Sequence, residues 1–434
     1  MKQVFLVLII TIVSKSFCYG QFATKDRLID NSAIIYDSSG EFSKAFKDRI
    51  KEELANVRIL ALGEASHEDG STFEQKVNLI KFLHQEMGYE VIAFEYGFYG
   101  NWKTNENLKA GMDVEEATKY SGWSKSAYAF PIYQYIAESY KTEYPLHYAG
   151  FDKEKVPDGI PNINTLLDTM ISHFDLDVNP PDRQFLDSLV LAIYSGMGND
   201  FKNKITYDQR NRAKEIIKEL QSELLDKRNQ LIERFSETEI TIWDYTLQSI
   251  LMSEKTVFAG SFHNIVRDKN MADRIIFLAD SIYRGKKIIL WGASGHFARN
   301  MISIDRNMPE NSYGFFPYYQ TGDWLYEHFG NQYYSIAFTT GEGKVGTIYP
   351  EGHKFKKYEE FRTLENNHPN SYEIIANETG VDFLFTSLKF SEPIRSSNMS
   401  FISYALGYQE DFACWNNVFD AFLFIKNMKP DKWR

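Results

Sequence analysis

A carboxylate and an imidazole stand three residues apart in the string GEASH, residues 63–67. Histidine is the side chain best suited to take a proton near neutral pH. A carboxylate beside an imidazole fixes its tautomer and raises its basicity, and either Glu64 or the later Glu95 could do this for His67. The pattern predicts that His67 can take a proton near neutral pH and makes it a candidate general base. The competing interpretation is a satisfied, partly buried histidine.

Three apolar stretches of the chain are typical of buried strands, and each ends in a carboxylate. They cover residues 57–64, 91–95 and 146–152 and end at Glu64, Glu95 and Asp152. In open parallel sheets, ligands bind beyond the carboxyl ends of the strands. We therefore expect the three carboxylates to project from one edge of the sheet. Carboxylates held close together are costly unless cations, shared protons or hydrogen bonds offset them, which favours a functional site there.

The segments between these stretches predict helices. A helix should follow the first strand, opened by an S-x-x-E capping box at Ser71 and Glu74 and stopped at Gly88. This order gives a β-α-β unit with parallel strands and a right-handed crossover. Residues from about 160 to 250 are more polar and rich in Lys, Glu, Gln and Leu, which predicts a helical insertion.

The strand pattern returns after the helical region. Further strands are expected over residues 287–291, 334–338, 383–386 and 421–425. We therefore predict an α/β fold, with a mostly parallel sheet flanked by helices and a helical insertion covering the carboxyl edge of the strands.

Composition and missing motifs exclude several functions. The formal net charge of −11 gives no electrostatic support for a nucleic-acid partner. No G-x-S-x-G elbow occurs, since the nearest string, GASGH at residues 292–296, has His where the second Gly should stand. The chain also lacks a P-loop, an H-E-x-x-H motif and a paired C-x-x-C.

The N-terminus has the pattern of a signal peptide. Lys2 supplies a positive start, Val4–Val13 form a short apolar run, and cleavage before Gln21 would remove residues 1–20. The alternative, a lipid on Cys18, fits a lipobox poorly. No other run of about 20 apolar residues occurs, so we expect an exported protein with no stable membrane span.

A longer string around the His67 motif resembles a known family. LGEASHEDGSTFEQKVNLIKFLHQEMGYEVIAFEYG, residues 62–97, is similar to the N-terminal signature of erythromycin esterases. That signature is G-E-x-x-H, then an acidic and a basic residue on the helix, then G-F/Y and a strand that ends in Glu. Weaker matches follow in the expected order at residues 150–152, 264–272, 291–296 and 419–421.

The resemblance implies an erythromycin esterase-like hydrolase domain over residues 21–434, interrupted by the helical insertion. It implies hydrolysis of an ester, a macrolactone in the named members, by water rather than by a serine, and with it antibiotic resistance. No cofactor or metal is implied, and the partner is a small-molecule ester. The catalytic candidates are the base, two carboxylates and two groups for the oxyanion: His67, Glu64, Glu95, Arg267 and His296. The substrate-binding candidates are Lys76, Glu74 and Asp152.

This chain departs from the family at one motif. The family's W-A-H-N-x-H reads WGASGH here, so that Ala293 and Ser294 replace a His and an Asn. A macrolide therefore need not be the substrate. Three alternatives stay open: a metal-dependent hydrolase in which His67, His296 and the carboxylates bind Zn or Mn, an exopolysaccharide acyl esterase, and a non-catalytic exported binding protein.

Overall fold

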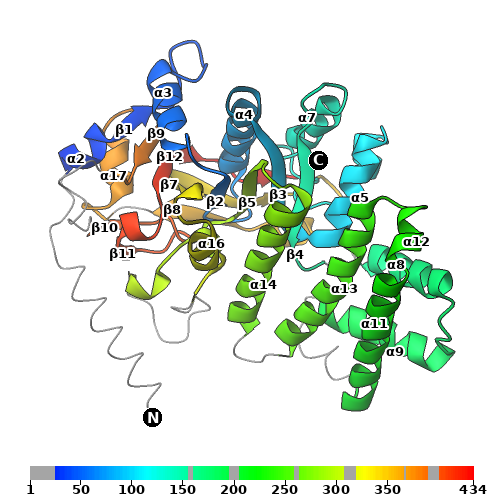
Figure 1. The fold of residues 1–434 in the computed structure, drawn as a ribbon. Helices are drawn as coiled ribbons and strands as arrows, with labels where there is room; N and C mark the ends of the chain where they lie inside the picture. Colours follow the sequence, from blue (N-terminus) through cyan, green and yellow to red (C-terminus); the bar gives the residue numbers. More distant parts are fainter. Residues whose placement is uncertain are drawn as a thin grey trace. The chain divides into compact units, whose positions relative to one another are not determined.

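The fold is seen in a computed structural model of the chain (Figure 1). It describes residues 25–154, 160–194, 205–258, 263–306, 319–365, 368–389 and 400–434, so the predicted signal peptide lies outside the described residues. The chain forms two compact units. The first runs to Ile92 and includes Trp123–Tyr135 and Lys286–Arg434, and the second comprises Ala93–Gly122 and Ile136–Gly285.

The first unit is built on a mostly parallel sheet. The order of its strands is β1-β9-β12-β7-β2-β5. Both partners of β2, which are β5 and β7, run parallel to it, as β12 does to β7, whereas β9 is antiparallel to β12 and to β1. The bounds are β1 Ser32–Ile34, β2 Ile59–Glu64, β5 Lys287–Ala293, β7 Tyr333–Ile348, β9 Phe383–Ser387 and β12 Ala421–Met428. The predicted α/β class with a mostly parallel sheet is thus confirmed.

Shorter strands complete this unit. β8, Phe361–Glu365, and β13, Asp431–Lys432, pair with the second half of β7. A small separate sheet has the order β10-β11-β6, with bounds Ser400–Ser403, Asp411–Cys414 and Asp305–Arg306. The helices of the unit are α2 Lys25–Asp30, α3 Lys44–Glu53, α4 Gly70–Met87, α15 Ser294–Phe297, α16 Thr321–Phe329 and α17 Tyr372–Asn377.

Helix α4 confirms the helix expected after β2 but not its start. The helix begins at Gly70, directly after Asp69, and no side chain caps it. The hydroxyl of Ser71 instead donates to Asn427 O at 3.2 Å and accepts from Lys429 N at 2.9 Å, so the predicted capping box is wrong. The Ser71 hydroxyl is thus hydrogen-bonded to the end of β12 and to the segment after it. The spacing of residues along the sequence cannot reveal such a tertiary contact. The stop at Gly88 is confirmed by its left-handed φ of 69°.

The second unit is mainly helical. β3, Tyr89–Gly97, begins in the first unit and ends in this one, which also holds β4, His147–Asp152. Its helices include α5 Phe98–Lys109, α6 Val114–Thr118, α8 Ile160–Phe174, α9 Pro180–Tyr194, α11 Tyr207–Asp226, α12 Arg228–Ile232, α13 Glu237–Val257 and α14 His263–Phe277. Another helix, α7 Pro131–Ser139, crosses from the first unit into the second.

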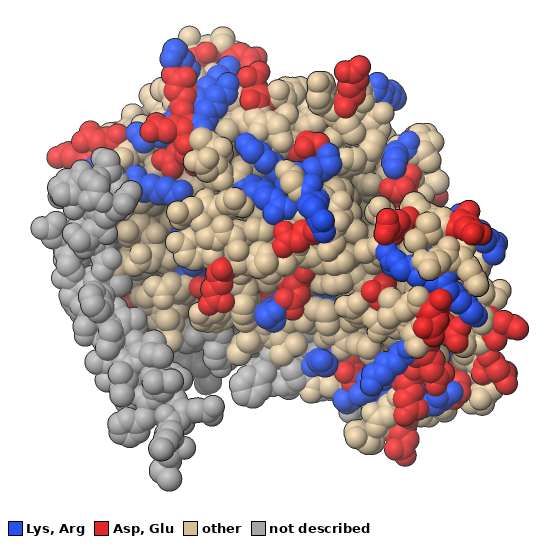
Figure 2. Space-filling view, in the orientation of Figure 1, with Lys and Arg blue, Asp and Glu red and all other residues tan. Residues whose placement is uncertain are grey.

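The described parts of the predicted helical region, residues 160–194 and 205–250, are mainly helical. Figure 1 shows α14, α13 and α11 side by side, and α14 and α5 pack against β4. Arg212 on α11 forms an ion pair with Glu219 at 3.1 Å, and Lys227, directly after α11, forms one with Glu223 at 3.0 Å. In Figure 2 basic and acidic side chains alternate over this part of the surface, as expected of a solvated helix face. Whether the insertion covers the carboxyl edge of the strands stays a prediction. Among the described residues, no helix is long and apolar enough to cross a bilayer.

Candidate functional site

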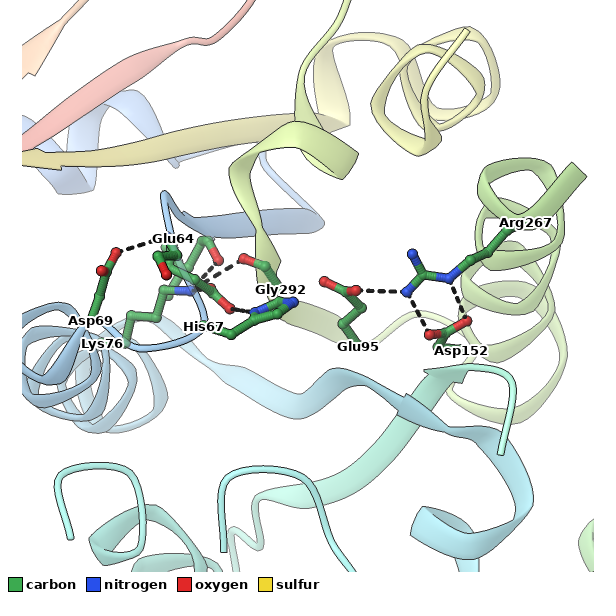
Figure 3. Close-up of polar contacts among 10 residues, drawn as sticks. Glu64, His67, Asp69, Lys76, Glu95, Asp152, Arg267 and Gly292 are labelled. Atoms are coloured by element: carbon green, nitrogen blue, oxygen red, sulfur yellow. Dashed lines mark hydrogen bonds and ion pairs between the residues drawn. The ribbon is translucent and has the colours of Figure 1, made fainter. Parts of the chain in front are cut away.

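His67 and Glu64 are in direct contact. Glu64 is the last residue of β2 and is fully buried, whereas the side chain of His67, three residues later, is 47% exposed. His67 Nδ1 lies 3.0 Å from Glu64 Oε1 (Figure 3). The carboxylate therefore lies on the buried side of the imidazole, and the ring still reaches solvent.

Lys76 occupies the other oxygen of Glu64. It projects from α4, is fully buried, and pairs with Glu64 Oε2. Its ammonium also donates to Leu62 O at 2.6 Å and lies 3.4 Å from Gly292 O. Since Lys76 is enclosed, the contribution predicted for it in substrate binding would pass through Glu64 rather than through contact with a ligand.

The charge of Glu64 follows from these contacts. Burial raises the pKa of its carboxyl, but the attraction of Lys76 and the contacts with His67 outweigh burial and hold that pKa below its ordinary value. Glu64 is therefore ionised near neutral pH and can only accept hydrogen bonds. The proton of a neutral His67 then resides on Nδ1 and is donated to Glu64. The other nitrogen, Nε2, carries the basic lone pair.

Aromatic rings support this cluster. The ring of His67 meets Trp123 edge-on, with centroids 5.4 Å apart, and Trp123 in turn contacts Phe73 and Trp291. The ammonium of Lys76 lies 5.0 Å from the centre of the Trp291 ring. Trp123 has a φ of 59°, a left-handed backbone that costs a residue other than glycine on the order of 1–3 kcal/mol. The strained backbone supports a positioning role for Trp123.

Asp69 is a buried acid that the sequence analysis missed. Its side chain is fully buried, and Oδ2 accepts a hydrogen bond from Ser66 N at 2.9 Å, which holds the loop that carries His67. Burial raises the pKa of Asp69 to about 7, although the bond from Ser66 opposes this. Only the position of Asp69, two residues after His67, could have indicated it.

The segment after β5 places Ser294 and His296. Ser294 is 1% exposed and donates to Ala405 O at 2.7 Å, so its hydroxyl is held in a structural contact. A Cβ at Gly63 would lie 2.5 Å from Ser294 Cα, which explains the glycine before Glu64. His296 lies in α15 and is 8% exposed. Its predicted action on the oxyanion stays a prediction.

Arg267 organises a second cluster, within the second unit. It projects from α14 and contacts Asp152 at the end of β4 through two nitrogens: Nη2 is 2.7 Å from Oδ2 and Nε is 3.3 Å from Oδ1. The same Nη2 lies 2.8 Å from Glu95 Oε1 (Figure 3). Burial lowers the pKa of Arg267, but the two carboxylates outweigh it and raise the pKa above its ordinary value. The structure therefore brings together Arg267, Glu95 and Asp152, and the guanidinium offsets the repulsion between the acids.

Glu154 lies next to this cluster along the chain and was not indicated by the sequence analysis. It is 4% exposed and accepts hydrogen bonds from Tyr99 N at 2.6 Å and Gly100 N at 3.1 Å, at the start of α5. Burial raises its pKa to about 7, and the charge of Asp152 adds to this. Glu154 fixes the start of α5, a role that no local sequence pattern indicates.

Glu74 lies outside the His67 cluster. Glu74 is exposed on α4 and belongs to the lining of a surface pocket. Among the described residues, no three His, Cys, Asp or Glu side chains gather in a geometry that could hold a metal ion. The roles predicted for Glu74, Asp152 and the other candidates in catalysis or binding stay predictions.

Comparison with known proteins gives a family match. The model of the erythromycin esterase family matches residues 84–428, so the match begins after the GEASH string. A Bacillus subtilis (strain 168) protein, YbfO, whose name assigns it provisionally to the hydrolases, is 26% identical over 349 residues, which are 73% of this chain and 72% of YbfO.

Three solved structures share the fold. A Bacillus cereus protein has a TM-score of 0.70 at 18% identity, covering 94% of this chain and 98% of its own. A succinoglycan biosynthesis protein has a TM-score of 0.69 at 16% identity, covering 94% and 97%. A histidine-to-asparagine mutant of erythromycin esterase EreC, in its open conformation, also has 0.69 at 16%, covering 92% and 98%.

Proposed function

Because the chain belongs to the erythromycin esterase family, we propose that it is a hydrolase that cleaves an ester bond with water activated by His67. The family match and the similarity to YbfO support the hydrolase class. The observation that carries the proposed mechanism is the 3.0 Å contact between His67 Nδ1 and the buried, ionised Glu64. That contact leaves the basic lone pair on the ring nitrogen that does not face Glu64.

The proposed reaction consumes one water and yields an acid and an alcohol. His67 Nε2 takes a proton from water while the water oxygen bonds to the ester carbonyl carbon, whose π electrons move to the carbonyl oxygen. The oxyanion then collapses, the bond to the alcohol oxygen breaks, and the imidazolium returns the proton to that oxygen. Glu64 stabilises the imidazolium throughout because its charge stays beside Nδ1.

Lys76 supports this chemistry indirectly. It keeps Glu64 ionised at a position where burial alone would favour the neutral acid. A neutral Glu64 could offer His67 a proton instead of accepting one, and the tautomer needed for catalysis would be lost.

A hydrolysis screen of the purified chain tests the proposal. Macrolides, simple aryl esters and acylated glycans would be supplied in parallel, with product measured by mass spectrometry. We expect turnover of at least one ester class, persisting after treatment with a chelator. Activity lost to chelator and restored by Zn or Mn would instead favour a metal-dependent hydrolase. A folded chain inert towards all three classes would favour a non-catalytic binding protein.

Acyl esters of an exported polysaccharide are a second candidate substrate class. One solved structure of the same fold is a succinoglycan biosynthesis protein, and the N-terminal pattern of this chain is that of an exported protein. In the same screen, deacylation of glycans without macrolide cleavage would support this class and count against the antibiotic resistance that the family resemblance implies.

Export is proposed from the positive start and the short apolar run of the N-terminus. We expect mass spectrometry of the protein from its natural host to show a chain that starts near Gln21, outside the cytosol. Full-length chain recovered from the cytosolic fraction would contradict this.

A further inference from the structure

We propose that a pocket beside the first half of α4 binds a neutral saccharide. The pocket has a volume of about 620 Å³, within the range of about 300–1,000 Å³ common for small-molecule sites. It is lined by the segment after β1, by one face of α4 and by the start of β9. None of the residues of the His67 cluster lines it, so the proposal does not depend on the proposed hydrolase activity.

The spacing on α4 separates the pocket from the His67 cluster. Glu74, Gln75 and Asn78 line the pocket, and the i, i+4 relation puts Glu74 and Asn78 on one helix face. Lys76, on the same helix, is fully buried against Glu64. One helix therefore contributes to two separate polar environments.

An aromatic side chain forms a preorganised part of the pocket. The ring of Tyr36 stacks on Phe42 with centroids 5.2 Å apart and meets Phe383 edge-on at the same distance. Its hydroxyl donates to Gln75 Oε1, and Asn78 Nδ2 lies 3.5 Å from it. Tyr36 and Phe383 both line the pocket, and aromatic rings beside polar groups suit the C–H and hydroxyl groups of a sugar ring.

The side-chain amide of Gln75, which lines the pocket, makes only one hydrogen bond within the described part of the chain. Its side chain is only 7% exposed, and one end of its amide is occupied by Tyr36. The other end, Nε2, has no hydrogen-bond partner within the described part of the chain. Because Gln75 lines the pocket, this end of its amide is available to hydrogen-bond a ligand atom.

The charged side chains that line the pocket disfavour some classes of ligand. Three carboxylates, Asp37, Glu74 and Asp382, line the pocket, and none of the described lining residues is Lys, Arg or His. An anionic ligand would be repelled, and a purely apolar one would leave carboxylates desolvated. The acids do not gather as a metal site. Sugar hydroxyls can donate to carboxylates and accept from amides, which satisfies both kinds of lining group.

Direct binding tests this proposal without any activity assay. The purified chain would be screened on an array of neutral gluco-, galacto- and manno-oligosaccharides, and the best binder titrated by calorimetry. We expect Asn78→Ala and Glu74→Gln each to weaken binding about tenfold, the effect of one lost hydrogen bond. Gln85→Ala, two turns further along the exposed side of α4 and outside the pocket lining, is the matched control and should bind as the parent does.

Three results would overturn the proposal. One is a folded chain that binds no neutral saccharide on the array. Another is binding that survives both pocket substitutions, and the third is a pocket that responds only to a polyamine such as spermidine. His67→Ala should bind the saccharide with unchanged affinity. Loss of hydrolysis in that variant together with retained binding therefore separates the pocket from the proposed reaction.

Discussion

The two polar clusters both pair carboxylates with basic side chains, but in opposite proportions. In the first unit, one carboxylate, Glu64, lies between a fully buried lysine and a histidine whose side chain is 47% exposed. In the second unit, one arginine, Arg267, is held by two buried carboxylates and is 20% exposed. The first cluster contains an imidazole, whose ring nitrogen can accept a proton, and the second contains a permanently charged guanidinium.

Under the proposed mechanism, the first cluster transfers protons and the contacts of the second support the fold. A base must reach solvent or substrate while its partner stays fixed, and the His67 cluster has that arrangement. The bidentate contact between Arg267 and Asp152 fixes α14 to the end of β4, as a planar guanidinium does best. If the distinction is correct, substitution of His67 should affect activity more than folding, whereas substitution of Arg267 should affect folding foremost.

The largest expected effect is on catalysis, from His67→Ala. Loss of the general base should lower kcat by ~10²–10⁴-fold on the best ester of the screen. Folding should change little because the side chain is half-exposed and its main partner, Glu64, keeps Lys76. Steady-state kinetics, together with circular dichroism of both proteins, measure the two quantities.

Ser294→Ala is the matched control for a serine mechanism. Its hydroxyl already donates to Ala405 O, so its loss should reduce kcat far less than the loss of His67. The opposite outcome, with Ser294→Ala inactive and His67→Ala active, would show a covalent serine route and refute the water mechanism.

Next in size are the effects on stability of removing each buried cation. Lys76→Met and Arg267→Met should each lower the free energy of unfolding by about 3–5 kcal/mol, because a buried carboxylate loses its counter-charge. Urea unfolding curves measure this. The exposed ion pair Lys44–Asp48 provides the control. Because 89% of the Lys44 side chain is exposed, Lys44→Met should lower the free energy of unfolding by only about 0–1 kcal/mol.

A second substitution sharpens the comparison between the clusters. In the Lys76→Met background, Glu64→Gln should recover stability because the uncompensated charge is gone, yet it should not recover activity. If it restores turnover, the ionised Glu64 is not needed and the proposed tautomer of His67 is wrong.

The smallest expected effect is a difference in pH dependence between two buried acids. The pKa of Glu154 is raised from 4.5 to about 7, so the folded state binds the proton more tightly than the unfolded state. Its contribution to stability is therefore largest below about pH 4.5 and declines as pH rises to about 7. Glu64, whose pKa is lowered, contributes stability above its unfolded value, and that contribution is lost as pH falls through the lower folded pKa.

Unfolding experiments from about pH 3 to 8 measure the two slopes, that of Glu64 below about pH 4.5 and that of Glu154 between about pH 4.5 and 7. Relative to the parent, Glu154→Gln should become more stable as pH rises, by up to about 1.4 kcal/mol for each unit of pKa difference. Glu64→Gln should show the opposite trend. Parallel curves for both variants would show that the two acids do not differ in protonation on folding.

Much of the fold follows from local patterns in the chain. Strands β2, β4, β5, β9 and β12 lie where runs of apolar residues predict them, and Gly88 ends α4 as expected. Burial on both faces of a parallel sheet demands continuous apolar runs, which are visible without knowing the neighbours. Local patterns do not predict which strands pair, because β2 lies between β5 and β7, which come more than 200 residues later in the chain.

The sequence alone therefore determined that Glu64 ends a buried strand and that His67 follows it within reach, because both depend on residues close together in the chain. Tertiary structure decided the rest. Lys76 is enclosed against Glu64, Ser71 bonds to the end of β12, and Arg267 joins Asp152 across 115 residues. Such contacts depend on which surfaces the packed core brings together and on which polar groups it deprives of water, and neither is encoded in the spacing of residues along the chain.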